Sequence, residues 1–258
     1  MLQDERLDAI VQYLNEHDRI DIETICEINN VSKDTARRDL IQLEEKGKII
    51  RIRGGAKRIL LSNEVYNYGE RMNMALEAKS KIGKFAASLI NNGDRLILDA
   101  STTVQFLAKY LTSRNHTVVT NSINIASVLS QREDIKINLL GGTLSHRHQA
   151  IYGSRAIRDV QDYKVNKCII STCGISSEGL STSIEEEGLL ANEMIKRSDQ
   201  VIVLADATKF NKTFFQKMCD LDAVDIVITD KELSKNMQEM LNKHMIEVMV
   251  VPDHEGDY

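Results

Sequence analysis

Small hydroxyl residues directly follow an apolar run in segment 98–103, which reads Leu-Asp-Ala-Ser-Thr-Thr. Hydroxyl groups and backbone N–H groups at the start of a helix can bind a phosphate, and the helix dipole adds to the attraction. Ser and Thr also serve as ordinary helix N-caps, and the pattern alone favours that use. Asp206 and Lys209 follow another apolar run. Asp206 could accept hydrogen bonds from sugar hydroxyls or cap a helix, and Lys209 could supply a counter-charge for an anion.

Seven short apolar runs are predicted strands, and they place these polar residues. They cover residues 96–98, 118–119, 135–140, 168–170, 201–204, 226–228 and 248–251. Helical patterns separate most of them, the first over residues 77–90, which predicts a mostly parallel α/β sheet covered on both faces. Five of the runs stop in polar residues. Because the carboxyl ends of such strands border the ligand crevice, we expect these five turns to converge on one pocket.

Segment 21–58 predicts a second kind of site, a winged helix-turn-helix. Asp21 and Ser32 are candidate N-caps of two short helices, and Asn29-Asn30 predicts the turn between them. Two apolar-basic segments then predict a hairpin that ends at Gly54-Gly55. The apolar positions at helical spacing in the two helices are Ile22, Ile25, Ile28, Ala36, Leu40 and Leu43.

This segment is basic in an otherwise acidic chain. Residues 32–58 hold nine basic and four acidic residues, a local charge of +5, whereas the whole chain carries −5. DNA affinity comes largely from neutralising phosphates, so the segment fits a DNA-binding surface. A solvated, charged helix in some other helical domain would show the same charge. The helix-turn-helix spacing and the basic hairpin together favour DNA.

Composition is typical of a globular protein and does not indicate a membrane-spanning or a secreted one. The chain has 258 residues, of which 42% are hydrophobic and 28% charged, and no apolar stretch reaches the length of a membrane span. Its charged start does not resemble a secretion signal. The four cysteines lack metal-ligand spacing, so we expect free thiols, no metal and no cofactor. We expect a DNA-binding domain over residues 1–57, a connector over 58–75 and an α/β domain over 76–258.

Residues 31–56 resemble the DNA-binding signature of the DeoR family of bacterial repressors. The matched residues are Val31, Ser32, Thr35, Arg37, Arg38, Asp39, Leu40, Leu43, Glu44, Gly47, Arg51, Gly54, Gly55 and Ala56. Two positions depart from the family pattern, because Ala36 replaces a larger aliphatic residue and Arg53 replaces a histidine. The resemblance implies contacts to operator DNA from Ser32, Lys33, Thr35, Arg37, Arg38, Arg51 and Arg53.

The rest of the chain is similar to the sensor domain of the same family. The landmarks are LDASTT (98–103), VVTNS (118–122), LLGG (139–142), GIS…GLST (174–182), ADATKF (205–210) and DIVITD (225–230), with one departure at Asn166, where Asp is usual. Such domains are Rossmann-like, similar to ribose-5-phosphate isomerase, and generally bind phosphorylated sugars. The resemblance implies that Ser101, Thr102 and Thr103 hold phosphate, and that Asp99, Asn121, Gly174, Glu187, Asp206 and Lys209 line the rest of the pocket. Glu187 alone, in a run of three glutamates, is more typical of a solvated helix start.

Two functions compete. One is a DNA-binding transcriptional regulator, a repressor of a carbohydrate-metabolism operon, whose DNA affinity a phosphorylated sugar controls. We expect it in the bacterial cytoplasm, at the nucleoid when bound to DNA, as a homo-oligomer, since two-fold operators favour dimers. The other is a sugar-phosphate isomerase with an added DNA-binding module, in which Asp206 and Lys209 act on the substrate. The sequence lacks the Asp-Gly-Ala-Asp-Glu stretch that resembles isomerase catalysis, so we favour the regulator and no enzymatic activity.

Overall fold

The computed structural model describes residues 2–58 and 66–252, and the chain divides into two units, residues 1–62 and 63–258. The expected connector lies partly outside the described residues. Its last part, from Tyr66 onward, belongs to the second unit. Within the described ranges, the search for a helix long and apolar enough to cross a membrane finds none.

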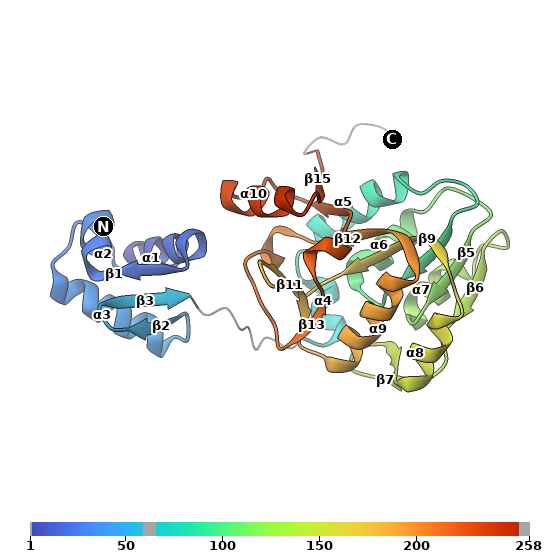
Figure 1. Ribbon diagram of the computed structural model, residues 1–258, viewed down its shortest axis with the longest axis horizontal. Helices are drawn as coiled ribbons and strands as arrows, with labels where there is room; N and C mark the ends of the chain where they lie inside the picture. The colour runs from blue at the N-terminus through green and yellow to red at the C-terminus, as the bar shows by residue number, and fades with distance from the viewer. Residues whose placement is uncertain (1, 59–65, 253–258) are drawn as a thin grey trace. The chain divides into compact units, whose positions relative to one another are not determined.

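The first unit is a small helical domain with a three-stranded sheet (Figure 1). The strands lie in the order β1-β3-β2 and are antiparallel. Its elements are α1 (Gln3–His17), β1 (Arg19–Asp21), α2 (Ile22–Asn29), α3 (Lys33–Glu45), β2 (Ile49–Ile52) and β3 (Gly55–Arg58). The predicted helix-turn-helix with its hairpin is therefore confirmed, and β1 is an additional strand that pairs with β3.

Local hydrogen bonds set the helix boundaries. The Asp21 carboxylate accepts from the backbone N–H of Thr24 at 2.7 Å, and the Ser32 hydroxyl accepts from the N–H of Thr35 at 3.3 Å. Asn30 has a φ of 50° and turns the chain between α2 and α3. Both predicted N-caps are therefore confirmed. The buried core consists of Leu7, Ile10, Leu14, Ile20, Ile25, Ala36, Leu40, Leu43, Ile49 and Ala56.

Two details of this unit differ from the prediction. Ile28 is 41% exposed and does not join the core, although its spacing matched that of Ile25. The hairpin does not end at Gly54-Gly55, because Gly55 starts β3. A Cβ atom on Gly55 would lie 2.0 Å from the carbonyl oxygen of Ile20, so the close pairing of β1 with β3 requires glycine there.

The second unit is built around one seven-stranded sheet. All seven strands are parallel, in the order β15-β14-β12-β9-β4-β5-β6. The seven predicted strands are these seven, so the predicted α/β class is confirmed. The unit starts with α4 (Tyr68–Asn73) and α5 (Leu76–Ser88) and continues as β4 (Arg95–Leu98), α6 (Thr102–Tyr110), β5 (Thr117–Thr120), α7 (Ile123–Leu129), β6 (Lys136–Leu139), α8 (Ser154–Gln161), β9 (Val165–Ser171), α9 (Glu185–Lys196), β12 (Ser198–Leu204), β14 (Ile226–Thr229), α10 (Lys235–Lys243) and β15 (Glu247–Val250).

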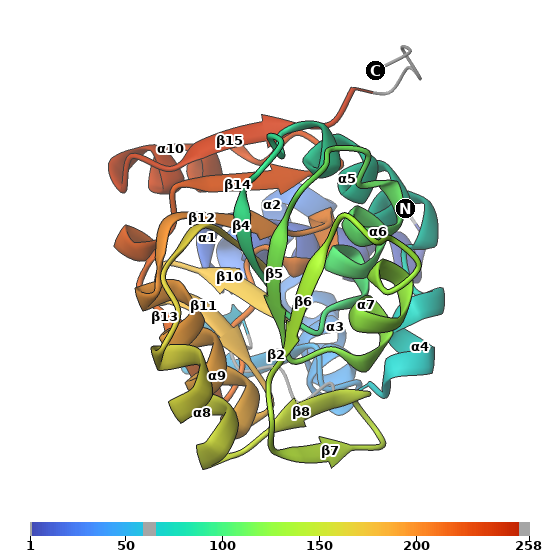
Figure 2. The same ribbon diagram turned by 90° about the vertical axis from the view of Figure 1, so that its right-hand side faces the viewer.

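Helices cover both faces of this sheet, because alternate strand residues face opposite sides. Leu96 and Leu98 of β4 pack with residues of α5, α6 and α7. Ile97 between them belongs to the other core cluster, with residues of α8, α9 and α10. Figure 2 shows α5, α6 and α7 on one side of the sheet and α8 and α9 on the other.

Shorter strands complete the unit. A hairpin of β7 (Thr143–Ser145) and β8 (Ala150–Tyr152) follows β6. A second small sheet has the order β10-β11-β13, with β10 (Gly174–Ser176), β11 (Gly179–Thr182) and β13 (Gln216–Cys219). Two 3₁₀ turns, η1 (Ala207–Lys209) and η2 (Leu221–Ala223), follow β12 and β13. All four cysteines are unpaired, as predicted.

Candidate functional site

The outer face of α3 and the β2–β3 hairpin form the candidate DNA interface in the first unit. Ala36, Leu40 and Leu43 hold α3 in the core, so the opposite face is free for contacts. The predicted DNA-binding residues of α3 and the hairpin are exposed, except for Thr35. Thr35 is half-buried, and its hydroxyl forms a hydrogen bond with the Ser32 hydroxyl. The exposed members are Ser32, Lys33, Arg37, Arg38, Arg51 and Arg53.

Three of these cations pair with exposed carboxylates. Lys33 pairs with Glu23, Arg37 with Asp34 at 3.2 Å, and Arg51 with Glu44 at 3.4 Å. Exposed pairs of this kind contribute little stability, so a phosphate can replace the carboxylate at small cost. For Arg38 and Arg53, no such ion pair is found among the residues that the structure describes.

A buried ion pair fixes the orientation of α3. Arg6 of α1 donates to Asp39 of α3 through Nε at 2.8 Å and through a terminal guanidinium nitrogen at 3.0 Å. Asp39 is 1% exposed, and two parallel hydrogen bonds fix both distance and angle. Asp39 is therefore a positioning residue, which explains its place in the signature although it faces away from any DNA.

The candidate ligand pocket of the second unit lies at the carboxyl ends of the central strands. The chain leaves β4 toward β5 on one side, and β9 flanks β4 on the other, so this is the point where the strand order reverses. One cavity of about 150 Å³ is lined by residues 101–103 after β4, by residues 171–173 at the end of β9, and by Asp206, Thr208 and Lys209 after β12. The predicted convergence is confirmed for these three turns. It was wrong for residues 120–122 and 141–143, which are not among the residues that line this cavity, because β5 and β6 lie farther toward the edge of the sheet.

The start of α6 forms one wall of this pocket. Ser101 is the N-cap of α6 and accepts from the N–H of Val104 at 3.2 Å. Thr102 and Thr103 form the first turn, whose N–H groups lack partners within the helix. All three residues are nearly buried and line the cavity. The wall therefore offers hydroxyl groups, amide groups and the positive end of a helix dipole to an anion.

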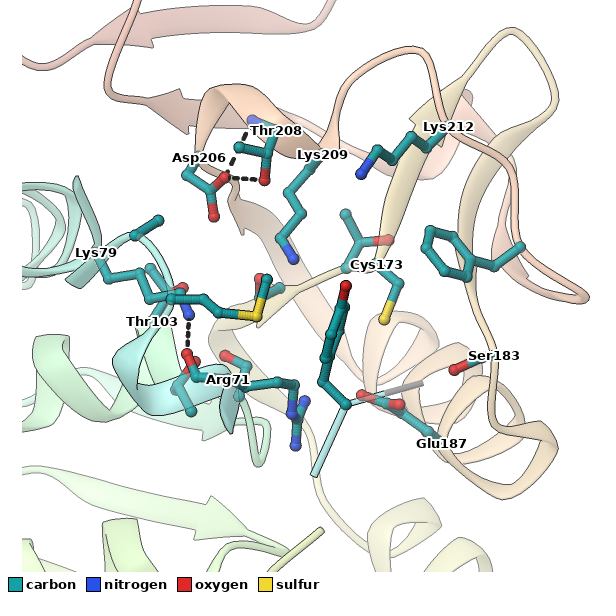
Figure 3. Close-up of a pocket in the computed structure, with 18 of the residues that line it drawn as sticks. Arg71, Lys79, Thr103, Cys173, Ser183, Glu187, Asp206, Thr208, Lys209 and Lys212 are labelled. Atoms are coloured by element: carbon teal, nitrogen blue, oxygen red, sulfur yellow. Dashed lines mark hydrogen bonds between the residues drawn. The ribbon is translucent and has the colours of Figure 1, made fainter. Parts of the chain in front are cut away.

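Four cations from separate elements also line the pocket. They are Arg71 of α4, Lys79 of α5, Lys209 of η1 and Lys212 in the loop after η1, and Figure 3 shows them around one hollow. Lys79 is 4% exposed, and its ammonium donates to the backbone carbonyl of Arg71. Burial, followed by the nearby charge of Lys209, lowers the pKa of Lys79 to about 8. A buried ammonium in this position favours an anionic ligand that offsets its desolvation.

Two carboxylates balance these cations on other walls of the pocket. Glu187 accepts a hydrogen bond from the Thr182 hydroxyl at 2.7 Å. The third glutamate of the acidic run therefore faces the cavity and not the solvent. Asp206 is 2% exposed and accepts from the N–H of Thr208 at 3.0 Å. Asp206 therefore does cap η1, as one interpretation predicted, and it also faces the cavity.

The remaining three predicted residues are not among those that line the cavity. Asp99 accepts from the N–H groups of Ser101 at 3.0 Å and Ser171 at 2.9 Å, which ties the ends of β4 and β9 together. Burial raises the pKa of Asp99 to about 6, although both hydrogen bonds oppose this. Asn121 donates to the Ile151 carbonyl at 3.1 Å. Gly174 lets the Lys212 backbone approach, since a Cβ would lie 2.4 Å from that carbonyl oxygen.

Sequence reasoning missed Arg71, Lys79, Lys212 and His148 as lining residues. Arg71 and His148 come from a short helix and a hairpin turn, which strand-end patterns do not identify. A signal existed for Lys79. It precedes Ile82 and Ala86 at helical spacing on the buried face of α5, and a lysine on such a face indicates a paired or functional charge.

Comparison with known proteins identifies the domain types of both units. Residues 6–60 match the DeoR-like helix-turn-helix domain, and residues 74–231 match the DeoR C-terminal sensor domain. The chain is 45% identical to the HTH-type transcriptional repressor GlcR of Bacillus subtilis (strain 168), over 99% of each chain. It is 31% identical to the lactose phosphotransferase system repressor of Staphylococcus aureus (strain COL), over 96% of this chain and all of that one.

A similar solved structure is ribose 5-phosphate isomerase A of Methanocaldococcus jannaschii, with 15% identity, a TM-score of 0.35 and coverage of 52% of this chain and 54% of that one. The full-length matches are to transcriptional repressors, so the regulator interpretation is confirmed over the isomerase. With its two domain matches covering most of its length, the chain belongs to the DeoR family of helix-turn-helix transcriptional regulators.

Proposed function

We propose that this regulator represses a carbohydrate-metabolism operon, and that a phosphorylated sugar bound in the second unit controls its affinity for operator DNA. The observation that carries the proposal is the cation-rich pocket at the strand-order reversal of a unit joined to a basic helix-turn-helix. The GlcR and lactose phosphotransferase system repressors support it as relatives. Its place of action is the bacterial cytoplasm, at the nucleoid.

On DNA, the N-terminal half of α3 enters the major groove, and the hairpin contacts phosphates. The carboxylates that pair with exposed cations give way to phosphates, which releases counterions and makes binding salt-dependent. A homodimer presents two such helices to a two-fold operator. In this arrangement, Ser32 caps the helix. The side chains that contact base edges are those of Lys33, Thr35, Arg37 and Arg38. The side chains of Arg51 and Arg53 contact phosphates.

In the pocket, the phosphate of the effector lies between the start of α6 and two lysines. Thr102 and Thr103 donate from hydroxyl and backbone groups, and Lys79 and Lys209 supply charge. Asp206 and Glu187 accept from hydroxyl groups of the sugar. Asp99, Asn121 and Gly174 hold the surrounding frame rather than the ligand itself.

The segment that leads away from the DNA-binding unit gives this ligand a route of action. Tyr66, Arg71, Met74 and Ala75 all line the pocket, and α4 is the first described helix after residue 65. Because Lys79 donates to the Arg71 carbonyl, a phosphate that attracts this ammonium competes with its bond to α4. Allosteric coupling between two binding sites typically amounts to about 1–3 kcal/mol, and we expect a value in this range.

A thermal-shift series tests the ligand class. The purified full chain is melted with glucose 6-phosphate, fructose 6-phosphate and galactose 6-phosphate, and with each parent sugar at the same concentration. A ligand that binds only the folded state raises the melting temperature by mass action. We expect one ester to raise it while its parent sugar does not. Equal shifts from ester and parent, or none from a panel extended to pentose and triose phosphates, would contradict the proposal.

A further inference from the structure

His148 lines the pocket from an element that the proposed phosphate site does not use. Its side chain belongs to the turn of the β7–β8 hairpin and is 9% exposed. Within the described residues, its Nδ1 atom is buried and has no hydrogen-bond partner. A buried polar atom without a partner is costly, and native proteins seldom keep one without a reason. A rotation of the ring about its Cβ–Cγ bond can turn this nitrogen toward the cavity that His148 lines, where a ligand atom becomes its partner.

Several hydrogen bonds hold the turn that carries His148. Gln149 has a φ of 54°, and its backbone N–H donates to the Ser145 carbonyl at 2.8 Å. Its side-chain amide donates to the His146 carbonyl, also at 2.8 Å. The Arg147 carbonyl accepts from the N–H of Tyr68 in α4 at 2.9 Å. The imidazole is therefore held at the pocket wall by a fixed turn.

The surroundings of His148 favour the neutral form of its imidazole. Burial lowers the pKa of His148 most, and the charge of Arg71 on α4 lowers it further. Glu187 and Glu186 raise this pKa, and Arg147 lowers it, by smaller amounts. A neutral imidazole has one donor and one acceptor nitrogen. A hydroxyl group also donates and accepts, so it is the ligand group that best matches this ring.

His148 and Lys79 belong to different ends of the pocket. The charge of Arg71 acts on the pKa of both groups. Lys209 and Asp206 act only on Lys79, whereas Glu187 and Glu186 act only on His148. Figure 3 shows Glu187 across the hollow from Lys79. An anion held by the lysines therefore leaves the other part of the ligand near Glu187 and the imidazole.

We infer that His148 is a specificity-determining residue that hydrogen-bonds a hydroxyl group of the bound sugar, at the end of the pocket opposite Lys79 and Lys209. This inference rests on the proposed function, since it assigns the phosphate to the lysine end. Glu187 accepts from a neighbouring hydroxyl at the same end. The pocket then distinguishes sugar phosphates by their hydroxyl pattern and not by the phosphate alone.

The chain offers a matched control for this inference, because His146 lies in the same turn but is exposed. Calorimetric titration of the full-length wild type, His148→Leu, His148→Gln and His146→Leu uses glucose 6-phosphate, fructose 6-phosphate, galactose 6-phosphate and inorganic phosphate. We expect His148→Leu to weaken the tightest sugar phosphate by about three- to tenfold, the cost of one neutral hydrogen bond. His148→Gln restores most of that affinity, and His146→Leu leaves it unchanged. Inorganic phosphate should bind all four proteins with the same affinity.

Each other outcome has one meaning. Sugar phosphate affinities of His148→Leu and His148→Gln within twofold of wild type would overturn the role of His148 and leave the proposed function intact. An equal loss for sugar phosphate and inorganic phosphate would also overturn it, because the damage would then be general. If no sugar phosphate binds the wild type, the proposed function fails and the inference fails with it. Melting curves of each variant establish that it is folded.

Discussion

Replacing Lys79 by Met removes a buried positive charge from the pocket and should stabilise the ligand-free protein. Its pKa falls from the ordinary value of 10.5 to about 8, a difference that corresponds to about 3 kcal/mol of destabilisation. Met leaves the Arg71 carbonyl without this donor, at a cost of about 1 kcal/mol. The expected net gain is about 2 kcal/mol, or about 4–8 °C in melting temperature for a unit of this size.

The pH dependence gives this prediction a sign that can be checked. Because the folded-state pKa lies below the unfolded one, the unfolded chain holds more protons between about pH 8 and pH 10.5. Wild-type stability therefore rises across that window. The advantage of Lys79→Met should be full below pH 8 and should shrink as the pH approaches 10.5.

Urea unfolding followed by far-UV circular dichroism suits a chain without tryptophan. Curves for wild type and Lys79→Met at pH 7 and pH 10 give the two differences. Lys84→Met is the matched control, since Lys84 is exposed on the same helix and its replacement should change neither curve. A variant that is no more stable than wild type at pH 7, or whose advantage persists at pH 10, would refute the assignment of Lys79 as a destabilising buried charge.

The remaining predictions concern the first unit. Arg38→Ala should weaken operator binding by about five- to 150-fold while effector binding stays the same, and unchanged DNA affinity at matched salt would place the recognition surface elsewhere. Gly55→Ala should destabilise the unit by more than about 2 kcal/mol, because its Cβ meets the Ile20 backbone. Gly54→Ala meets nothing within 4 Å and should cost only about 1 kcal/mol for its positive φ. Urea unfolding of both variants measures the two changes in unfolding free energy. Equal losses of stability would show that the pairing of β1 with β3 can adjust to a Cβ atom at position 55.

Continuous apolar runs such as residues 96–98 and 201–204 were sufficient to predict the central sheet, because its strands are buried on both faces. The short strands β7, β8 and β10 could not be predicted in this way, because each has only three residues. Ile28 shows the limit for helices. Ile28 lies three residues after Ile25 and is 41% exposed, whereas Asn29, four residues after Ile25, is buried on the core face.

The strand pattern predicted pocket residues only where they follow the central strands, and Glu187 of α9 was predicted by the family resemblance alone. Ser101, Thr103 and Lys209 line it because the topology brings the ends of β4 and β12 together. Asp99 directly follows the same strand, yet its side chain turns inward to bond the backbone of β9. Arg71 and His148 arrive from α4 and the β7–β8 hairpin, whose positions depend on tertiary packing that no local pattern records.

Control of DNA binding by the pocket is the central claim, and one titration tests it directly. Fluorescence anisotropy of a DNA duplex, selected from a random pool by the full chain, is followed for wild type and Lys209→Ala with and without each sugar phosphate. We predict that one ester shifts the DNA affinity of wild type by about five- to 150-fold, and that its parent sugar does not. Lys209→Ala should bind the duplex normally and ignore the ester. An equal response of Lys209→Ala, or no response of wild type to any ester, would contradict this control.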